Sequence, residues 1–171
     1  MLLHNEKINK ILKNELDNNY VNIRINKGGL YETLLYILSK KARSNNLLNP
    51  LIIKTQVLNY IKEQSKLWKE LSMIYSKYDV NFKNVDKLNK FSEVFLDINH
   101  TGYNEELILI NKIFELNIIL LNHNASSTKN LFLCLGAKEK QSINDDNRYI
   151  MIDYEAPNKY SIIMYNNRSK N

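Results

Sequence analysis

The chain contains few of the side chains that carry out covalent chemistry, and they are spread widely along the sequence. It has one cysteine, Cys134, and three histidines, His4, His100 and His123. Cys134 lies in the apolar run 131–135, which favours a small buried residue over a reactive thiol. We interpret His100 and His123 as surface turn residues and His4 as part of a helix. Since the histidines lack the spacing of a zinc site, we expect no metal and no cofactor.

Two further short motifs were weighed as binding sites. Gly28 and Gly29 precede a predicted helix, and backbone N–H groups at a helix N-terminus can bind an anion. No Lys-Ser or Lys-Thr pair follows them, as it would in a phosphate-binding loop. We therefore interpret the glycines as a turn whose backbone shape requires glycine. The adjacent carboxylates of Asp145 and Asp146 lie in a polar segment and indicate a solvated turn.

Length and composition indicate one soluble globular domain. The chain has 171 residues, of which 44% are hydrophobic and 25% charged. The longest apolar runs, 34–38 and 131–135, are too short to cross a membrane, and the N-terminus has no signal-peptide pattern. A single cysteine excludes a disulfide framework within the chain. We therefore expect a cytoplasmic protein with no membrane partner.

The positive charge is concentrated in the first half of the chain. The formal net charge is +6, and residues 1–90 hold 16 basic and eight acidic residues, against eight and ten in residues 91–171. A basic face could bind RNA. Only four of the 24 basic residues are arginine, the residue that contacts phosphates and bases in a bidentate manner. Codon bias in an A/T-rich genome is the simpler explanation for the lysines, and both explanations stay open.

Apolar residues at helical spacing predict helices over most of the first two thirds of the chain. We expect a helix within 1–19, at 4–17, and another from about Leu30 to Arg43. Asn49 and Pro50 should begin the next one. Further helices are expected over 65–77 with Ser65 as cap, over 84–97 with Ile98 on the apolar side, and after Asn104 as cap.

The last third of the chain instead shows patterns typical of strands. We expect strands over 117–122, 131–135, 148–154 and 159–165, the last two forming a hairpin, in addition to an extended segment at 20–25. Helices followed by strands predict an α+β fold with a small sheet packed against helices.

Four segments, in this order, resemble the ovarian tumour (OTU) family of papain-like cysteine deubiquitinases. Residues 26–34, Asn-Lys-Gly-Gly-Leu-Tyr-Glu-Thr-Leu, resemble the family pattern Asp-Gly-Asn-Cys-Leu-Phe-x-x-Leu. Residues 101–107, Thr-Gly-Tyr-Asn-Glu-Glu-Leu, resemble Trp-Gly-Gly-x-x-Glu-Leu, and 117–121 match the strand that follows. Residues 150–163 resemble a strand, a short turn and His-Tyr-Asn/Asp-x-Val. The resemblance covers about residues 20–168 and implies an OTU-like, papain-like fold with a mostly antiparallel sheet, as one domain over 20–171.

The family's catalytic side chains are missing at the matching positions. The resemblance places Gly29 where the family has its nucleophilic cysteine and Lys159 where it has the general-base histidine. Ser161 stands at the position of the orienting Asp or Asn, Asn26 at that of the first Asp, and Thr101 at that of the Trp. A protonated lysine cannot accept a proton. The resemblance also implies that the backbones of residues 29 and 159 face each other across a groove.

The resemblance therefore implies an inactive member of the family. A one-residue shift of the alignment does not restore a nucleophile, since residues 26–31 include no Cys, Ser or Thr. We expect a pseudoenzyme that acts by binding a protein, with ubiquitin or a ubiquitin-like protein as the partner. The alternative is a structural subunit of a larger assembly, such as a ribonucleoprotein, that uses its basic N-terminal half. A hydrolase with unrecognised catalytic residues is a third hypothesis.

Overall fold

A computed structural model of the chain describes residues 20–24, 28–42, 49–122, 132–135, 150–155 and 159–165. The helices are α2 (Leu30–Ala42), α3 (Pro50–Glu63), α4 (Leu67–Tyr75), α5 (Leu88–Leu96) and α6 (Asn104–Phe114), with a 3₁₀ turn η1 at Val80–Phe82. The strands are β1 (Tyr20–Arg24), β2 (Ile118–Asn122), β3 (Phe132–Leu135), β4 (Ile150–Glu155) and β5 (Lys159–Tyr165). The predicted α+β class is confirmed. The helix expected within 1–19 lies outside the described residues.

The five strands form one sheet in the order β1-β5-β4-β2-β3. Three of the four strand pairs are antiparallel, and β2 with β4 is parallel. The predicted hairpin of β4 and β5 is present, with Asp153 opposite Ser161 and Tyr154 opposite Tyr160. The mostly antiparallel sheet that the resemblance implied is therefore confirmed. The order places β5 between β1 and β4, where it contacts α2.

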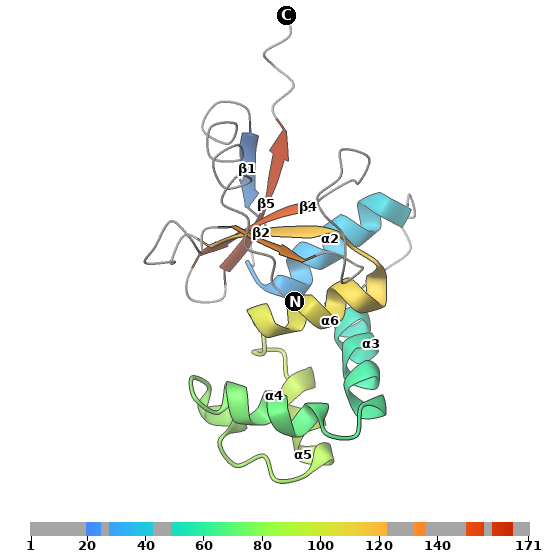
Figure 1. Ribbon diagram of the computed structural model, residues 1–171, viewed down its shortest axis with the longest axis vertical. Helices are drawn as coiled ribbons and strands as arrows, with labels where there is room; N and C mark the ends of the chain where they lie inside the picture. Colours follow the sequence, from blue (N-terminus) through green and yellow to red (C-terminus); the bar gives the residue numbers. More distant parts are fainter. Residues whose placement is uncertain are drawn as a thin grey trace, which may run out of the picture.

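The helices continue the core away from the sheet. In Figure 1, α2 and α6 lie beside the sheet, and α3 leads from them to α4 and α5 at the opposite end of the molecule. One continuous apolar cluster joins helices and sheet, because the stripe of each helix faces inward. It contains the predicted stripe of α2 and that of α3: Leu30, Leu34, Ile37, Leu38, Ile53, Val57, Leu58 and Ile61. No helix in the described part of the chain is both long and apolar enough to cross a membrane.

The beginning of α3 is as predicted, whereas that of α4 is not. The side chain of Asn49 caps α3 by accepting a hydrogen bond from the Leu51 N–H at 2.8 Å. Ser65 does not cap α4. It lies in a turn closed by the Leu67 N–H and the Gln64 carbonyl at 3.0 Å, and α4 begins only after this turn.

The predicted helix over 84–97 begins later, at Leu88. Residues 84–87 are irregular, and they follow the short turn η1, whose Phe82 is buried. The Asp79 side chain caps η1 by accepting a hydrogen bond from the Asn81 N–H at 2.8 Å, which stabilises a tight turn at this place. Ile98 was expected on the buried side of this helix but is 90% exposed, because the helix ends at Leu96.

The expectation that Asn104 caps α6 was also wrong. Asn104 is the first helical residue, and the preceding residue, Tyr103, is the N-cap. The Tyr103 N–H donates to the Glu106 carboxylate at 3.2 Å. The side chain of Asn104 accepts a hydrogen bond from the Tyr160 hydroxyl at 2.9 Å, which connects α6 to β5.

Candidate functional site

The N-terminus of α2 lies against the start of β5. The Gly28 carbonyl accepts a hydrogen bond from the Tyr160 N–H at 2.7 Å. The Thr33 hydroxyl lies 2.9 Å from the carbonyl of Gly29 and 3.3 Å from that of Tyr160. A methyl group added at Gly28 would lie 3.8 Å from Cγ of Lys159. The structure thus brings together two segments that are 130 residues apart in the sequence.

A third segment, the loop before α6, completes this region. The Leu30 N–H donates to the Thr101 carbonyl at 2.8 Å. Gly102 follows at φ +95°, with its Cα facing Leu30 and Tyr31. Because these contacts join the loop to the first turn of α2, the loop before α6 fixes where that helix begins.

The predicted site residues lie at different depths in this region. Gly29 is buried at the N-terminus of α2, and Lys159 is exposed as the first residue of β5. Ser161 is buried and lies opposite Asp153 of β4 and Arg24 of β1. Asn26 lies outside the described residues.

The other residues with reactive side chains are not brought to this region by the described part of the chain. Cys134 belongs to β3, which is separated from β5 by β4 and β2. His4, His123, Asp145 and Asp146, which were interpreted as residues outside any site, lie outside the described residues.

Glu32, in the first turn of α2, lies directly over Gly29. A Cβ atom added at Gly29 would collide with Oε2 of Glu32 and would lie 3.3 Å from its Cδ and 3.2 Å from the Thr101 carbonyl. Oε2 is buried and has no hydrogen-bond partner among the described residues. A carboxylate at this place is favoured by the partial positive charge at the helix N-terminus.

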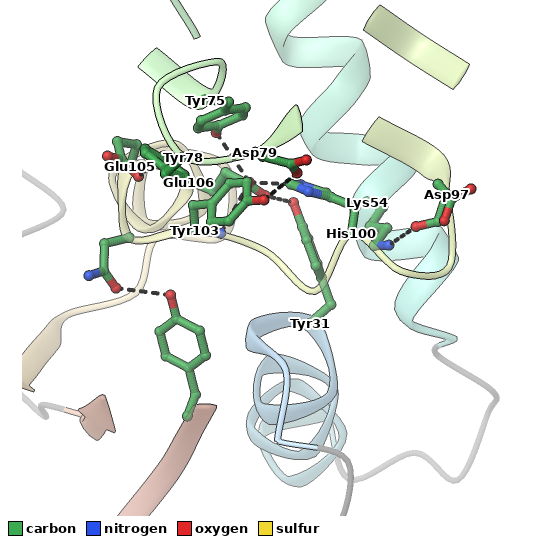
Figure 2. A network of polar contacts seen from close by, with 12 residues as sticks. Tyr31, Lys54, Tyr75, Tyr78, Asp79, Asp97, His100, Tyr103, Glu105 and Glu106 are labelled. Atoms are coloured by element: carbon green, nitrogen blue, oxygen red, sulfur yellow. Dashed lines mark hydrogen bonds and ion pairs between the residues drawn. The ribbon is translucent and has the colours of Figure 1, made fainter. Parts of the chain in front are cut away.

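A fully buried carboxylate, that of Glu106, is the centre of a polar network behind this region (Figure 2). The hydroxyl of Tyr31 donates to its Oε2, and that of Tyr75 donates to its Oε1 at 3.1 Å. The Tyr103 N–H is the third donor. These bonds join α2, α4 and α6 in the interior. They compensate the desolvation of the carboxylate, which would be costly if it were unpaired.

His100 is part of this network, so its interpretation as a surface turn residue was wrong. Its side chain is only 2% exposed, and Nε2 lies 2.9 Å from Oε1 of Glu106. Aromatic rings surround it, with centroid distances of 4.9 Å to Phe95, 5.0 Å to Tyr103, 5.7 Å to Phe82, 6.1 Å to Tyr75 and 6.4 Å to Tyr31. These rings come from five separate elements: α2, α4, η1, α5 and the loop before α6. They surround His100 only in the folded chain.

Further polar contacts connect neighbouring elements to this network. The hydroxyl of Tyr103 donates to Asp79, and that of Tyr78 donates to Glu105 at 3.2 Å. The Lys54 ammonium donates to the Asp97 carbonyl at 2.8 Å and lies 5.4 Å from the centroid of the Tyr31 ring. Burial lowers the pKa of Lys54, although nearby carboxylates oppose this effect.

Solved structures identify the fold. The structure is similar to the OTU domain of OTUD1, with a TM-score of 0.56 and 14% identity, over 93% of both chains. It is also similar to the viral OTU domain proteases from Farallon virus (TM-score 0.56, 12% identity, 89% of this chain and 88% of that chain) and Taggert virus (0.53, 14%, 90% and 84%). The chain has an OTU-like fold. No protein-family model and no curated protein matches the sequence.

Within the OTU-like fold, sequence analysis found one part of the region and missed the other. The resemblance implied that the backbones of residues 29 and 159 face each other, and the α2 and β5 segments that hold them are in contact. Neither the position of Glu32 over Gly29 nor the buried network was predicted. A usable signal was present, since Glu106 is the acidic residue of the Gly-x-x-x-Glu-Leu segment and sits beside apolar residues. Among the described residues, no group of three or more His, Cys, Asp or Glu side chains could hold a metal ion.

The buried tyrosines of this OTU-like fold predict loss of stability in alkali. Burial first, and then the charge of Glu106, raise the pKa of Tyr31 and of Tyr75 well above the ordinary tyrosine value near 10. Burial likewise raises the pKa of Tyr160. A folded-state pKa above the unfolded value gives stability that is complete below about pH 10 and is lost as the pH rises further. Tyrosinate absorbance at 295 nm should therefore show some of the 11 tyrosines ionising only together with unfolding. Ionisation of all of them near pH 10 in the folded protein would contradict this.

Proposed function

We propose that this chain is a catalytically inactive OTU-like domain that acts by binding a protein, ubiquitin or a ubiquitin-like protein. The observation that carries the proposal is the contact between the α2 N-terminus and β5, at the positions that the resemblance assigns to catalysis. Gly29 has no side chain to attack a carbonyl, and exposed Lys159 stands at the base position. Ser161 stands at the position of the orienter, so these three matched positions hold no nucleophile, base and orienter together.

A binding role is supported by exposed apolar side chains on the helical part of the fold. The resemblance places the ubiquitin contacts of the family on its helical part and on loops beside the active site. In this chain, the segment of α4 and η1 exposes three large apolar side chains, with Met73 at 65%, Tyr78 at 53% and Val80 at 69%. Loss of the catalytic side chains leaves such a surface intact, because fold and chemistry are separable.

The activity part of the proposal is tested with a fluorogenic ubiquitin substrate. We expect no turnover above the uncatalysed rate for the purified full chain. Turnover that survives purification to homogeneity would overturn the claim of inactivity. Loss of that turnover in Cys134→Ala would assign the chemistry to the single cysteine.

The binding part is tested by titrating the chain into ¹⁵N-labelled ubiquitin and linked ubiquitin dimers. We expect chemical-shift changes that saturate with a dissociation constant in the micromolar range. Val80→Glu should weaken binding about tenfold or more, because it puts a charge into an apolar contact. Gln56→Glu is the matched control, since it adds the same charge at an exposed position of α3 and should leave binding unchanged. Absence of shift changes at high micromolar concentration would remove ubiquitin as the partner.

A further inference from the structure

The space in front of Gly29 is occupied by part of the protein itself. Glu32 is the third residue of α2, and its side chain folds back over the residue that precedes the helix. The collision with an added Cβ involves Oε2, while the Thr101 carbonyl borders the same space at 3.2 Å. A side chain at position 29 therefore fits only when the carboxylate of Glu32 turns away.

Positive charge near the Glu32 carboxylate favours this arrangement. Oε2 is shielded from solvent without a hydrogen-bond partner among the described residues. The N-terminus of α2 favours an anion there. Lys54, whose pKa is influenced by Glu32, supplies positive charge from α3. The helix N-terminus thus already carries a resident anion.

We infer that Glu32 is an internal plug that occupies the nucleophile position of the OTU-like fold with its own carboxylate. In a thiol hydrolase, the end of this helix stabilises a thiolate. Here the same positive end is satisfied by Glu32, so a nucleophile at position 29 would have to displace the Glu32 carboxylate. The inference rests on the proposed function, since it explains how an inactive site is kept closed.

A consequence is that the missing cysteine alone cannot restore a reactive thiol. In Gly29→Cys the new sulfur would compete with Glu32 for space, and a neighbouring negative charge raises the pKa of a thiol. Removal of the carboxylate in Gly29→Cys/Glu32→Ala frees both the space and the helix N-terminus. The pair Gly29→Cys/Lys159→His would therefore need the change at Glu32 as well.

The test measures alkylation of the introduced thiol by iodoacetamide at pH 7 in the full chain, with each cysteine peptide quantified by mass spectrometry. Cys134 serves as the internal reference, since it is the single native cysteine. We expect alkylation at position 29 to be about tenfold or more faster in Gly29→Cys/Glu32→Ala than in Gly29→Cys, as a shift of one unit in thiol pKa implies. The rate against pH should show the lower thiol pKa in the double variant. The control Gly29→Cys/Glu93→Ala removes an exposed glutamate of α5 and should react like Gly29→Cys.

Equal rates and equal thiol pKa values with and without Glu32 would overturn the inference. If Gly29→Cys does not fold, the inference requires Gly29→Cys/Glu32→Ala to fold, which circular dichroism and thermal unfolding would report. Failure of both to fold would contradict it, because the obstruction would then come from the Thr101 backbone. These readouts involve no ubiquitin, so they can fail while the binding proposal stands. Turnover by the native chain that Glu32→Ala abolishes would make Glu32 a catalytic residue and overturn both proposals.

Discussion

Glu106→Ala is expected to lower the free energy of unfolding by about 3–5 kcal/mol, because it leaves several buried hydrogen-bonding groups without a partner. The carboxylate is fully buried, and the substitution leaves the hydroxyls of Tyr31 and Tyr75 without their acceptor. It also removes the acceptor for the Tyr103 N–H and the partner of His100. Because each buried polar group left unpaired costs about 1–3 kcal/mol, this is the largest effect we expect from a single polar side chain. Equilibrium unfolding in urea measures it.

The neighbouring residue Glu105 provides the matched control. It is also an acidic residue in the first turn of α6, but it is only partly buried and accepts from the exposed Tyr78 hydroxyl. Glu105→Ala should cost about 1 kcal/mol or less. Glu106→Gln keeps the volume of the side chain and one acceptor oxygen. Its cost in free energy of unfolding should fall between those of Glu106→Ala and Glu105→Ala. A cost for Glu106→Ala that equals that of Glu105→Ala would show that the network adds no stability.

Local patterns in the sequence predicted most of the fold. The stripe of α2 and the Asn49-Pro50 start of α3 rest on neighbouring residues, so they are visible without knowledge of the fold. The hairpin of β4 and β5 follows from alternating residues on both sides of a turn. The wrong predictions concern helix bounds and burial that depend on contacts between distant segments. The helix predicted to begin at residue 84 begins only at Leu88, and Ile98 is exposed because α5 ends before it.

The site could be predicted only in part, for the same reason. The resemblance identified Gly29 and Lys159, because motif positions are carried by short segments. The burial of His100 depends on aromatic residues from five separate elements, and no spacing in the sequence predicts it. The position of Glu32 depends on the missing Cβ at Gly29, which is a property of two residues together. The role of Glu106 as a buried acceptor likewise depends on hydroxyl groups from α2 and α4.

Gly102→Ala should destabilise the protein strongly, by about 3 kcal/mol or more, which combines backbone strain with overpacking. Gly102 has φ +95°, which residues with a side chain rarely adopt. An added Cβ would lie 2.7 Å from Cβ of Leu30 and 3.1 Å from the ring of Tyr31. Both neighbours are fully or almost fully buried in the core, so neither can move away. Equilibrium unfolding in urea measures this change in the free energy of unfolding.

Gly28→Ala measures the cost of backbone strain without the cost of steric crowding. Gly28 also has a positive φ, +61°, but the nearest atom to an added Cβ is Cγ of the exposed Lys159 at 3.8 Å. This substitution should cost only the backbone strain, about 1–2 kcal/mol. The difference between the two variants then measures how tightly the loop before α6 packs on the first turn of α2. Equal costs would mean that the loop can retreat from Leu30, and that the start of α2 is not fixed by this contact.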